Sequence, residues 1–300
     1  MKSPNSQRVK APRGFSRDRA TAYTVSVLNG KIVAGPHVRD ACRRHLKDLE
    51  KRHGKDLYFC RDTAAEAIAL FEEAYRLAGG EFEGKPFLLL PWQAFIIGSI
   101  FGWLEHKGGP RRFLWAYVET GKGSGKSPLA AGVGIKLLCA DREPRAEIYA
   151  AAVKKDQARV MFRDAVAIVE QSPELMARLT LTGGSEKNNI GYDSAGSFFR
   201  PISSEERGIG QSGPRPHGAL LDEIHEHPTN AMVEFLRAGT KARRQALIFM
   251  ITNSGTDPKS TCGQYHTYGA AVAAGTVPDD AFFAYICALD KGDDPFQSEA

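Results

Sequence analysis

The sequence predicts an α/β fold, with a mostly parallel central sheet flanked by helices and a helical N-terminal extension. From residue 112 onward, apolar runs of strand length alternate with segments of helical spacing. That alternation is typical of a parallel sheet covered on both faces. A glycine-rich loop joins the first of these runs to a helical segment. The 300 residues, 42% of them hydrophobic, suffice for one large α/β domain or two smaller ones.

Residues 1–85 are expected to form a basic arm and a helical extension. Residues 1–20 have the composition of a flexible basic arm. Residues 37–53 have the spacing of a basic amphipathic helix. A second helix is expected over residues 63–77, with Thr63 as its N-cap and a pair of glycines after it.

Residues 86–300 contain the alternating pattern and are expected to form the main domain. Pro91 suits the first turn of a third helix. Strands are expected at residues 112–119, 147–152, 197–202, 219–221, 246–252 and 281–289. Further helices are expected at residues 128–140, 155–171 and 229–238.

The net charge of +5 is unevenly distributed along the chain. Residues 1–60 contain 14 Lys or Arg against 5 Asp or Glu, whereas the remainder contains 26 against 30. The basic character therefore belongs to the N-terminal part. It is compatible with a polyanion partner such as nucleic acid, and equally with a solvated basic face.

Cysteine usage and hydropathy indicate a cytoplasmic setting. The five cysteines are scattered and form no C-x-x-C pair, which favours reduced thiols. The N-terminus has no apolar region typical of a signal peptide. The most apolar stretch, residues 87–104, is interpreted as a buried helix and not as a membrane segment.

The stretch ETGKGSGKS, residues 119–127, predicts a phosphate-binding loop. Its glycines free the backbone N–H groups to line one concavity, and a helix follows that would point its N-terminus at the phosphates. Lys126 would reach the outer phosphates and Ser127 would bind Mg²⁺. Thr120 stands where the usual motif has its first glycine, so a chance glycine-rich turn is the alternative. The candidate residues are Gly121, Gly123, Ser124, Gly125, Lys126 and Ser127.

A second element is the stretch ALLDEIHEH, residues 219–227. An apolar strand that ends in two carboxylates is the partner that a phosphate-binding loop requires. Asp222 would hold the water shell of Mg²⁺, and Glu223 would act as general base toward the attacking water. Together with the loop, the pair predicts a P-loop NTPase that binds and hydrolyses ATP. The alternative is an acidic pair that opens a solvated helix.

Two weaker elements complete the candidate site. Thr252 and Asn253 follow an apolar strand, where small polar side chains can sense the γ-phosphate, although an ordinary turn has the same composition. Gln93, in the stretch LPWQ, can pair with the adenine edge, although taken alone the start of a buried helix is the better explanation. His225 and His227 flank Glu226, but alternate positions on a helix diverge, so no zinc site is predicted.

In this order, the four elements resemble the large terminase subunit of tailed bacteriophages, the DNA-packaging motor. The resemblance runs from about Phe87 to the end of the sequence. It rests on LPWQ, RRFLWAYVETGKGSGKS, EIYAAAVKKDQARVMF, SGPRPHGALLDEIHEH and IFMITNSG. It implies an ATPase with ATP and Mg²⁺ as cofactors, which couples hydrolysis to translocation of double-stranded DNA into a procapsid.

The resemblance also implies partners and further residues. The partners are sequence-tolerant DNA, a portal protein, a small terminase subunit and further copies of the chain in a ring, in the host cytoplasm and with no membrane. Lys122 stands where the family often has a catalytic arginine. An arginine from the neighbouring subunit would be Arg215 or Arg207. The nuclease domain of the family is not expected in this segment.

Two other functions remain open at this point. One is a helicase-like ATPase that remodels nucleic acid. The other is a nucleotide-binding regulatory module that switches without turnover. Loss of ATPase activity in a Glu223→Gln variant would exclude the second.

Overall fold

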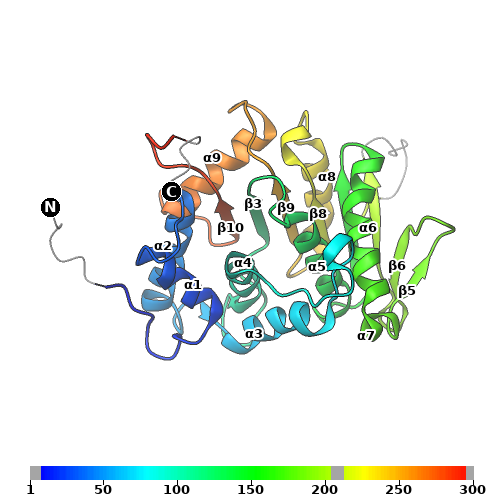
Figure 1. Ribbon diagram of the computed structural model, residues 1–300, viewed down its shortest axis with the longest axis horizontal. Helices are drawn as coiled ribbons and strands as arrows, with labels where there is room; N and C mark the ends of the chain where they lie inside the picture. The colour runs from blue at the N-terminus through cyan, green and yellow to red at the C-terminus, as the bar shows by residue number, and fades with distance from the viewer. Residues whose placement is uncertain (1–7, 204–212, 295–300) are drawn as a thin grey trace.

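The computed structural model describes residues 8–203 and 213–294, and its centre is an eight-stranded sheet (Figure 1). The strand order is β10-β3-β9-β8-β4-β7-β6-β5. Neighbours from β10 to β7 are parallel, and β5 and β6 run antiparallel at one edge. The strands are β3 (Trp115–Glu119), β4 (Glu147–Ala152), β5 (Thr180–Thr182), β6 (Asn189–Tyr192), β7 (Ser197–Ser203), β8 (Pro216–Leu221), β9 (Leu247–Thr252) and β10 (Phe282–Ile286).

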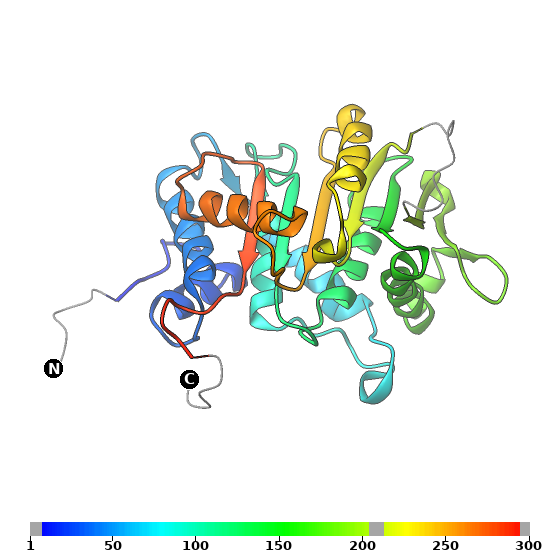
Figure 2. The ribbon, with the colours of Figure 1, turned by 90° about the horizontal axis from the view of Figure 1, so that it is seen from above.

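Helices cover both faces of this sheet, and two hydrophobic cores fill the space beneath them. Successive residues of a strand point to opposite faces. In β9, accordingly, Phe249 belongs to one core and Met250 to the other. Figure 2 shows α8 and α6 on opposite sides of the strands. The helices of this part are α5 (Lys126–Cys139), α6 (Lys155–Gln171), α7 (Pro173–Met176), α8 (Ala231–Gly239) and α9 (Thr261–Ala274).

The N-terminal helices pack on the larger core beside β10 and contribute to it. They are α1 (Arg19–Leu28), α2 (Pro36–Lys51), α3 (Arg61–Ala69) and α4 (Pro91–Gly102), with a small antiparallel pair formed by β1 (Tyr58–Phe59) and β2 (Trp103–Leu104). Tyr23 of α1 and Tyr285 of β10 join their hydroxyl groups at 2.8 Å. The core therefore includes residues from both sides of position 85. The division of the chain into two domains at that position remains a prediction.

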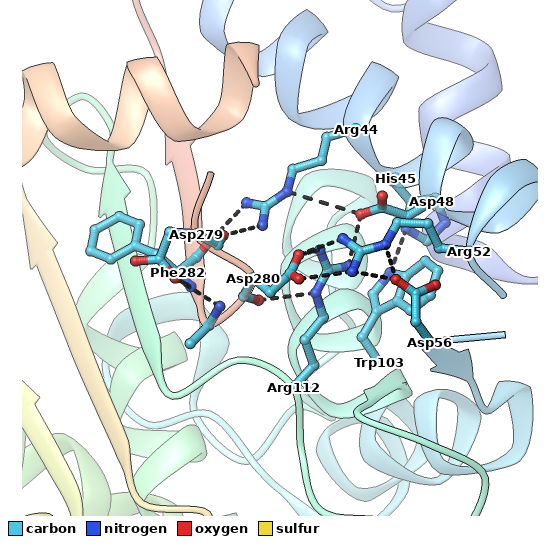
Figure 3. A network of polar contacts seen from close by, with 11 residues as sticks. Arg44, His45, Asp48, Arg52, Asp56, Trp103, Arg112, Asp279, Asp280 and Phe282 are labelled. Carbon is cyan, nitrogen blue, oxygen red and sulfur yellow. Dashed lines mark hydrogen bonds and ion pairs between the residues drawn. The ribbon is translucent and has the colours of Figure 1, made fainter. Parts of the chain in front are cut away.

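A network of ion pairs holds α2 against the sheet (Figure 3). Arg112, at the approach to β3, donates to Asp48 of α2 at 2.8 Å and to Asp280, just before β10, at 2.9 Å. Arg44 donates to two backbone carbonyls next to Asp280, and Arg52 pairs with Asp280 itself at 2.5 Å. The side chains of Arg112 and Asp48 are only 2% and 7% exposed. Each of these buried charges therefore needs the opposite charge of the other to offset the loss of water.

Most predicted elements are present, and the exceptions have local causes. β4 and α6 have the predicted bounds. The prediction of Thr63 as an N-cap was wrong, because α3 begins at Arg61 and Thr63 donates back to the carbonyl of Cys60 within its first turn. This helix ends earlier than predicted, in the π-helical turn Leu70–Ala74. α1, α9 and the β5–β6 hairpin were not predicted.

The apolar stretch at residues 87–104 contains a buried helix, as predicted, although Leu88 and Leu90 before that helix are exposed. The helix is α4, whose residues from Gln93 to Gly102 are all buried. Within residues 8–203 and 213–294, no helix is sufficiently long and apolar to cross a membrane.

Candidate active site

The glycine-rich loop lies between β3 and α5, as predicted, and its surface is open. Gly123 and Gly125 have φ angles of +77° and +84°, which L side chains rarely adopt. No atom lies within 4 Å of the position that a Cβ would occupy on Gly121 or Gly123. Lys126 begins α5. The backbone therefore has the conformation and the free space that a phosphate-binding nest needs.

Thr120 replaces a glycine in this loop without strain. Its φ is not among the positive values, which apart from glycines occur only at Arg142, Arg145 and Glu223 among the described residues. Its hydroxyl lies 2.7 Å from the hydroxyl of Ser124 across the loop, and its N–H donates to the carbonyl of Thr252 at 3.2 Å. The threonine therefore ties the beginning of the loop to its end and to β9.

Lys126, the first residue of α5, comes together with Asn253 and Glu223, which lie just after the carboxyl ends of β9 and β8. Lys126 is 5% exposed, and its ammonium donates to Oδ1 of Asn253 at 2.6 Å. The amide of Asn253 donates to Oε2 of Glu223 at 3.4 Å. Parallel strands end at one edge of the sheet, so residues far apart in the sequence meet there. One amide thus lies between the candidate phosphate ligand and the candidate base.

Asp222 is buried beside this group, with 4% of its surface exposed. Its Oδ1 accepts the backbone N–H of Glu223 at 2.8 Å, and Oδ2 accepts no hydrogen bond from the described residues. Burial, with the charge of Glu223 as the next cause, raises the pKa of Asp222 to about 7, against the opposing charge of Lys126. A buried carboxylate with a free oxygen suits a cation ligand.

Glu223 has a strained backbone, with φ +49° and ψ +53°. Left-handed conformations of non-glycine residues are costly and cluster at functional sites. The bend directs the chain into the 3₁₀ turn Ile224–Glu226, in which Nδ1 of His225 lies 3.2 Å from Oε2 of Glu223. The acidic pair therefore ends a strand, as predicted, and does not open a solvated α-helix.

Thr252 links this turn to the end of β9. Its hydroxyl oxygen accepts the backbone N–H of His225 at 3.1 Å, and Nδ1 of the same histidine lies at 3.1 Å. His225 was considered only as a metal ligand in the sequence, and no group of three metal-binding side chains occurs among the described residues. Its position shows that it supports the acidic turn.

Gln93 lies next to the loop and is buried. Its Oε1 accepts the backbone N–H of Leu90 at 2.9 Å and so caps its own helix. Its Nε2 is 3.3 Å from the point at which a Cβ on Gly125 would lie. The contact with the loop is clear, and recognition of adenine by this residue remains a prediction.

Of the other predicted residues, some lie on or beside the glycine-rich loop and one lies at the opposite end of the sheet. Ser127 follows Lys126 in the first turn of α5. Lys122 is exposed on the loop. Arg215 precedes β8 and its N–H donates to Glu147 at 2.8 Å, at the opposite end of the strand from Asp222. Arg207 lies outside the described residues.

Two carboxylates near the site were missed in the sequence. Glu119, the last residue of β3, is 2% exposed and accepts the hydroxyl of Ser254 at 2.9 Å. Asp164 of α6 has its pKa raised to about 6 by burial, and its charge adds to the raised pKa of Asp222. Glu119 begins the stretch ETGKGSGKS but is no part of the phosphate-binding pattern, and Asp164 lies in no motif, so no local pattern could have identified them.

The set of donors fits a triphosphate bound with Mg²⁺. The loop supplies backbone N–H groups and one lysine charge, which phosphates require. Ser127 and Asp222 supply the hydroxyl and the carboxylate oxygen that Mg²⁺ prefers. The ammonium of Lys126 and Oδ1 of Asn253 are 2.6 Å apart, so the start of α5 and the end of β9 meet at the site.

A family model and a curated relative indicate the same protein family. The family described as "Terminase large subunit, ATPase domain" matches residues 91–270, more than half of the chain. Protein YmfN of Escherichia coli (strain K12) is 38% identical over 82 residues, which cover 27% of this chain and 18% of that protein. The terminase large subunit of Enterobacteria phage HK97 is 23% identical over 204 residues, which cover 65% of this chain and 38% of that protein.

A solved structure has the same fold. The crystal structure of the HK97 bacteriophage large terminase aligns with a TM-score of 0.64 at 20% sequence identity, covering 77% of this chain and 45% of that one. The chain thus corresponds to less than half of the HK97 protein in either comparison. The predicted α/β fold with a mostly parallel sheet is confirmed.

Proposed function

The chain belongs to the terminase large subunit family, in its ATPase domain, and from that premise we propose that it hydrolyses ATP to drive double-stranded DNA into a viral procapsid. The observation that carries the proposal is the meeting of Lys126, Asn253 and Glu223 beside Asp222. A phosphate ligand, a polar sensor and a base are the parts that hydrolysis of a triphosphate needs.

Each residue has one role in the proposed reaction. The loop N–H groups and Lys126 bind the phosphates and stabilise the charge that develops on them. Glu223 accepts a proton from the attacking water. The amide of Asn253, between Lys126 and Glu223, orients the base relative to the phosphates. Bound Mg²⁺, which Ser127 and Asp222 would hold, would add positive charge at the phosphate oxygens.

Neighbouring subunits would complete the site. The proposed partners are DNA of any sequence, a portal protein, a small terminase subunit and further copies of this chain in a ring, in the host cytoplasm. Lys122 is exposed on the loop and would contact the γ-phosphate in cis. Arg215 lies at the far end of β8 from Asp222, so it would reach only the site of another subunit.

A Glu223→Gln variant tests the chemistry. Loss of the base should lower kcat about a hundredfold or more, while ATP binding is retained. Glu226→Gln is the matched control, because Glu226 is an exposed acid in the same short turn. Steady-state phosphate release and binding of a fluorescent ATP analogue provide the two measurements. Unchanged turnover in Glu223→Gln with intact binding would reject the assignment.

The nature of the nucleic acid separates packaging from unwinding. A packaging motor should be stimulated by double-stranded DNA in the presence of a portal or a small subunit, and phosphate contacts should make the stimulation salt-sensitive. Stimulation by single-stranded DNA alone would favour a helicase-like ATPase. A chain that binds ATP but shows no turnover with any of these partners would be a regulatory module.

A further inference from the structure

Glu119 is a buried carboxylate for which the proposed reaction has no use. It ends β3 immediately before the phosphate-binding loop. It accepts hydrogen bonds from Tyr117 at 2.7 Å, Ser254 at 2.9 Å and Nδ1 of His266 at 3.0 Å. These donors come from β3, from the segment after β9 and from α9. Burial alone would raise the pKa of Glu119, but these hydrogen bonds outweigh it and the pKa is lowered.

The contact with Ser254 reaches the candidate active site through one peptide bond. Asn253, the preceding residue, accepts from Lys126 at 2.6 Å and donates to Glu223 at 3.4 Å. The segment 253–254 is therefore held on one side by the proposed catalytic groups and on the other by Glu119. Glu119 itself contacts neither Lys126 nor Glu223 by any hydrogen bond of the described residues.

We propose that Glu119 is a positioning residue for ATP hydrolysis, which fixes the amide of Asn253 between Lys126 and Glu223 by holding Ser254. The inference rests on the proposed function and adds a residue to it. A small misplacement of a group that orients the reacting atoms has a large effect on rate. The site needs a rigid support of this kind, because the segment after β9 has no hydrogen-bonded ladder of its own.

The third hydrogen bond extends the support to α9 and α2. His266 of α9 donates to Glu119, and its ring contacts the ring of His37 edge-on at a centroid distance of 5.5 Å. His37 lies in the first turn of α2. Any shift of Asn253 during turnover would thus act on α9 and α2 through Glu119 and His266, and the arrangement supplies a mechanical connection from the site to the N-terminal helices.

Kinetics of four variants test the role of Glu119. Ser254→Ala and Glu119→Gln should each lower kcat about tenfold, and KM for ATP should stay within about threefold, because the loop contacts remain. Glutamine leaves only a neutral acceptor for the hydroxyl of Ser254, and alanine removes that hydroxyl. Both changes act on the same contact, so the double variant should be no slower than the slower single one. Ser254→Thr keeps the hydroxyl and should keep the kcat of the parent.

Tyr117→Phe is the matched control. It removes a hydrogen bond of 2.7 Å from the same buried carboxylate and a contact of 3.2 Å with Sγ of Cys262 in α9, but it removes no hydrogen bond of Ser254. Its kcat should stay near that of the parent. Equal losses of kcat in Tyr117→Phe and Ser254→Ala, or unchanged kcat in Glu119→Gln, would overturn the proposal.

Hydrogen exchange separates failure of this inference from failure of the proposed function. In the nucleotide-free protein, peptides that span residues 252–255 should exchange faster in Ser254→Ala and Glu119→Gln than in the parent or in Tyr117→Phe. A parent without ATPase activity would reject the proposed function, and faster exchange would still support the positioning contact. Unchanged hydrogen exchange in both variants would show that Glu119 does not hold this segment through Ser254, whatever the ATPase activity of the parent.

Discussion

Thr120 occupies the position at which a phosphate-binding loop usually has its first glycine. Because its hydroxyl meets that of Ser124 at 2.7 Å, the side chain closes the loop where glycine would leave it free. A hydrogen bond of this kind contributes about 0.5–1.5 kcal/mol. The substitution is therefore compatible with nucleotide binding and preorganises the loop for it.

Replacing this hydroxyl should weaken nucleotide binding. Thr120→Val keeps the shape of the side chain and removes the hydrogen bond, so Kd for ATP should rise by about two- to tenfold. Thr120→Ser keeps the hydroxyl and should bind as the parent does. Titration of a fluorescent ATP analogue measures both. Equal affinities of the valine and serine variants would show that the loop is not ordered by this contact.

His45 should make the stability of the protein depend on pH. The indole N–H of Trp103 can only donate, so Nδ1 of His45 must accept it at 3.1 Å, and Nε2 then carries the proton toward Thr21 at 3.0 Å. Burial, with the charge of Arg112 as the second cause, lowers the pKa of His45 to about 3. The unfolded chain takes up this proton near pH 6.5, well above the folded protein.

This difference in pKa fixes the sign of the slope of the free energy of unfolding against pH. Between pH 6.5 and about 3 the unfolded state binds the extra proton, so the free energy of unfolding should fall by at most about 1.4 kcal/mol for each pH unit of acidification. A His45→Gln variant keeps an acceptor and a donor but cannot titrate. Urea denaturation from pH 8 to 4.5 should therefore give a shallower slope for the variant. Identical slopes would contradict a neutral, buried His45.

At the scale of elements, the ion pairs of Arg112 hold α2 against the sheet. Arg112→Ala leaves Asp48 buried without its closest partner, and such a loss typically costs about 3–5 kcal/mol. Arg43→Ala, on the same helix, removes a cation that is 60% exposed and should change stability by less than about 0.5 kcal/mol. Urea denaturation of the two variants makes the comparison. Equal stabilities would mean that packing alone holds α2.

The elements that the sequence predicted well are those with a clear period or a motif. α6 alternates buried and exposed positions at helical spacing, and β4 is an uninterrupted apolar run after Glu147. α9 was missed because its core-facing positions are small residues. Gly269, for example, lies against Ala284 of β10, with 3.1 Å between its Cβ position and the side chain. Helical spacing of apolar residues is not visible in such a segment.

The residues of the candidate site fall into the same two groups, those that the sequence predicted and those that it did not. Each of Lys126, Asp222 and Asn253 follows a strand, and parallel strands end at one edge, so their order in the sequence predicted their proximity. Glu119 has donors at residues 117, 254 and 266. The pairing of β3 with β9 brings Ser254 to Glu119, and the packing of α9 on β10 and β3 brings His266 there, a contact that no pattern along the chain reveals.

For the whole molecule, the continuous core decides how the N-terminal part behaves. The larger hydrophobic core includes residues from Phe15 in the N-terminal part to Tyr285 in β10. Trp92 stacks on Tyr285, and Trp103 lies against His45 of α2. A part that shares its core in this way has little core of its own, and a small segment rarely folds alone without one.

We therefore expect residues 8–294 to unfold in one cooperative step. Trp103 reports on the N-terminal helices, while Trp115, at the start of β3, reports on the sheet through its stacking on Phe282. Two variants that keep only one of these tryptophans, with phenylalanine at the other positions, should each show the same urea midpoint by fluorescence as by far-UV circular dichroism. Comparing the two signals within one variant cancels any destabilisation that the substitutions cause. If residues 8–85 were a separate domain, as the division at residue 85 would suggest, their unfolding would remove His45 from Trp103, and the Trp103 signal would change at a different urea concentration from the Trp115 signal. The dichroism would then show two steps, and the shared core would not couple the two parts.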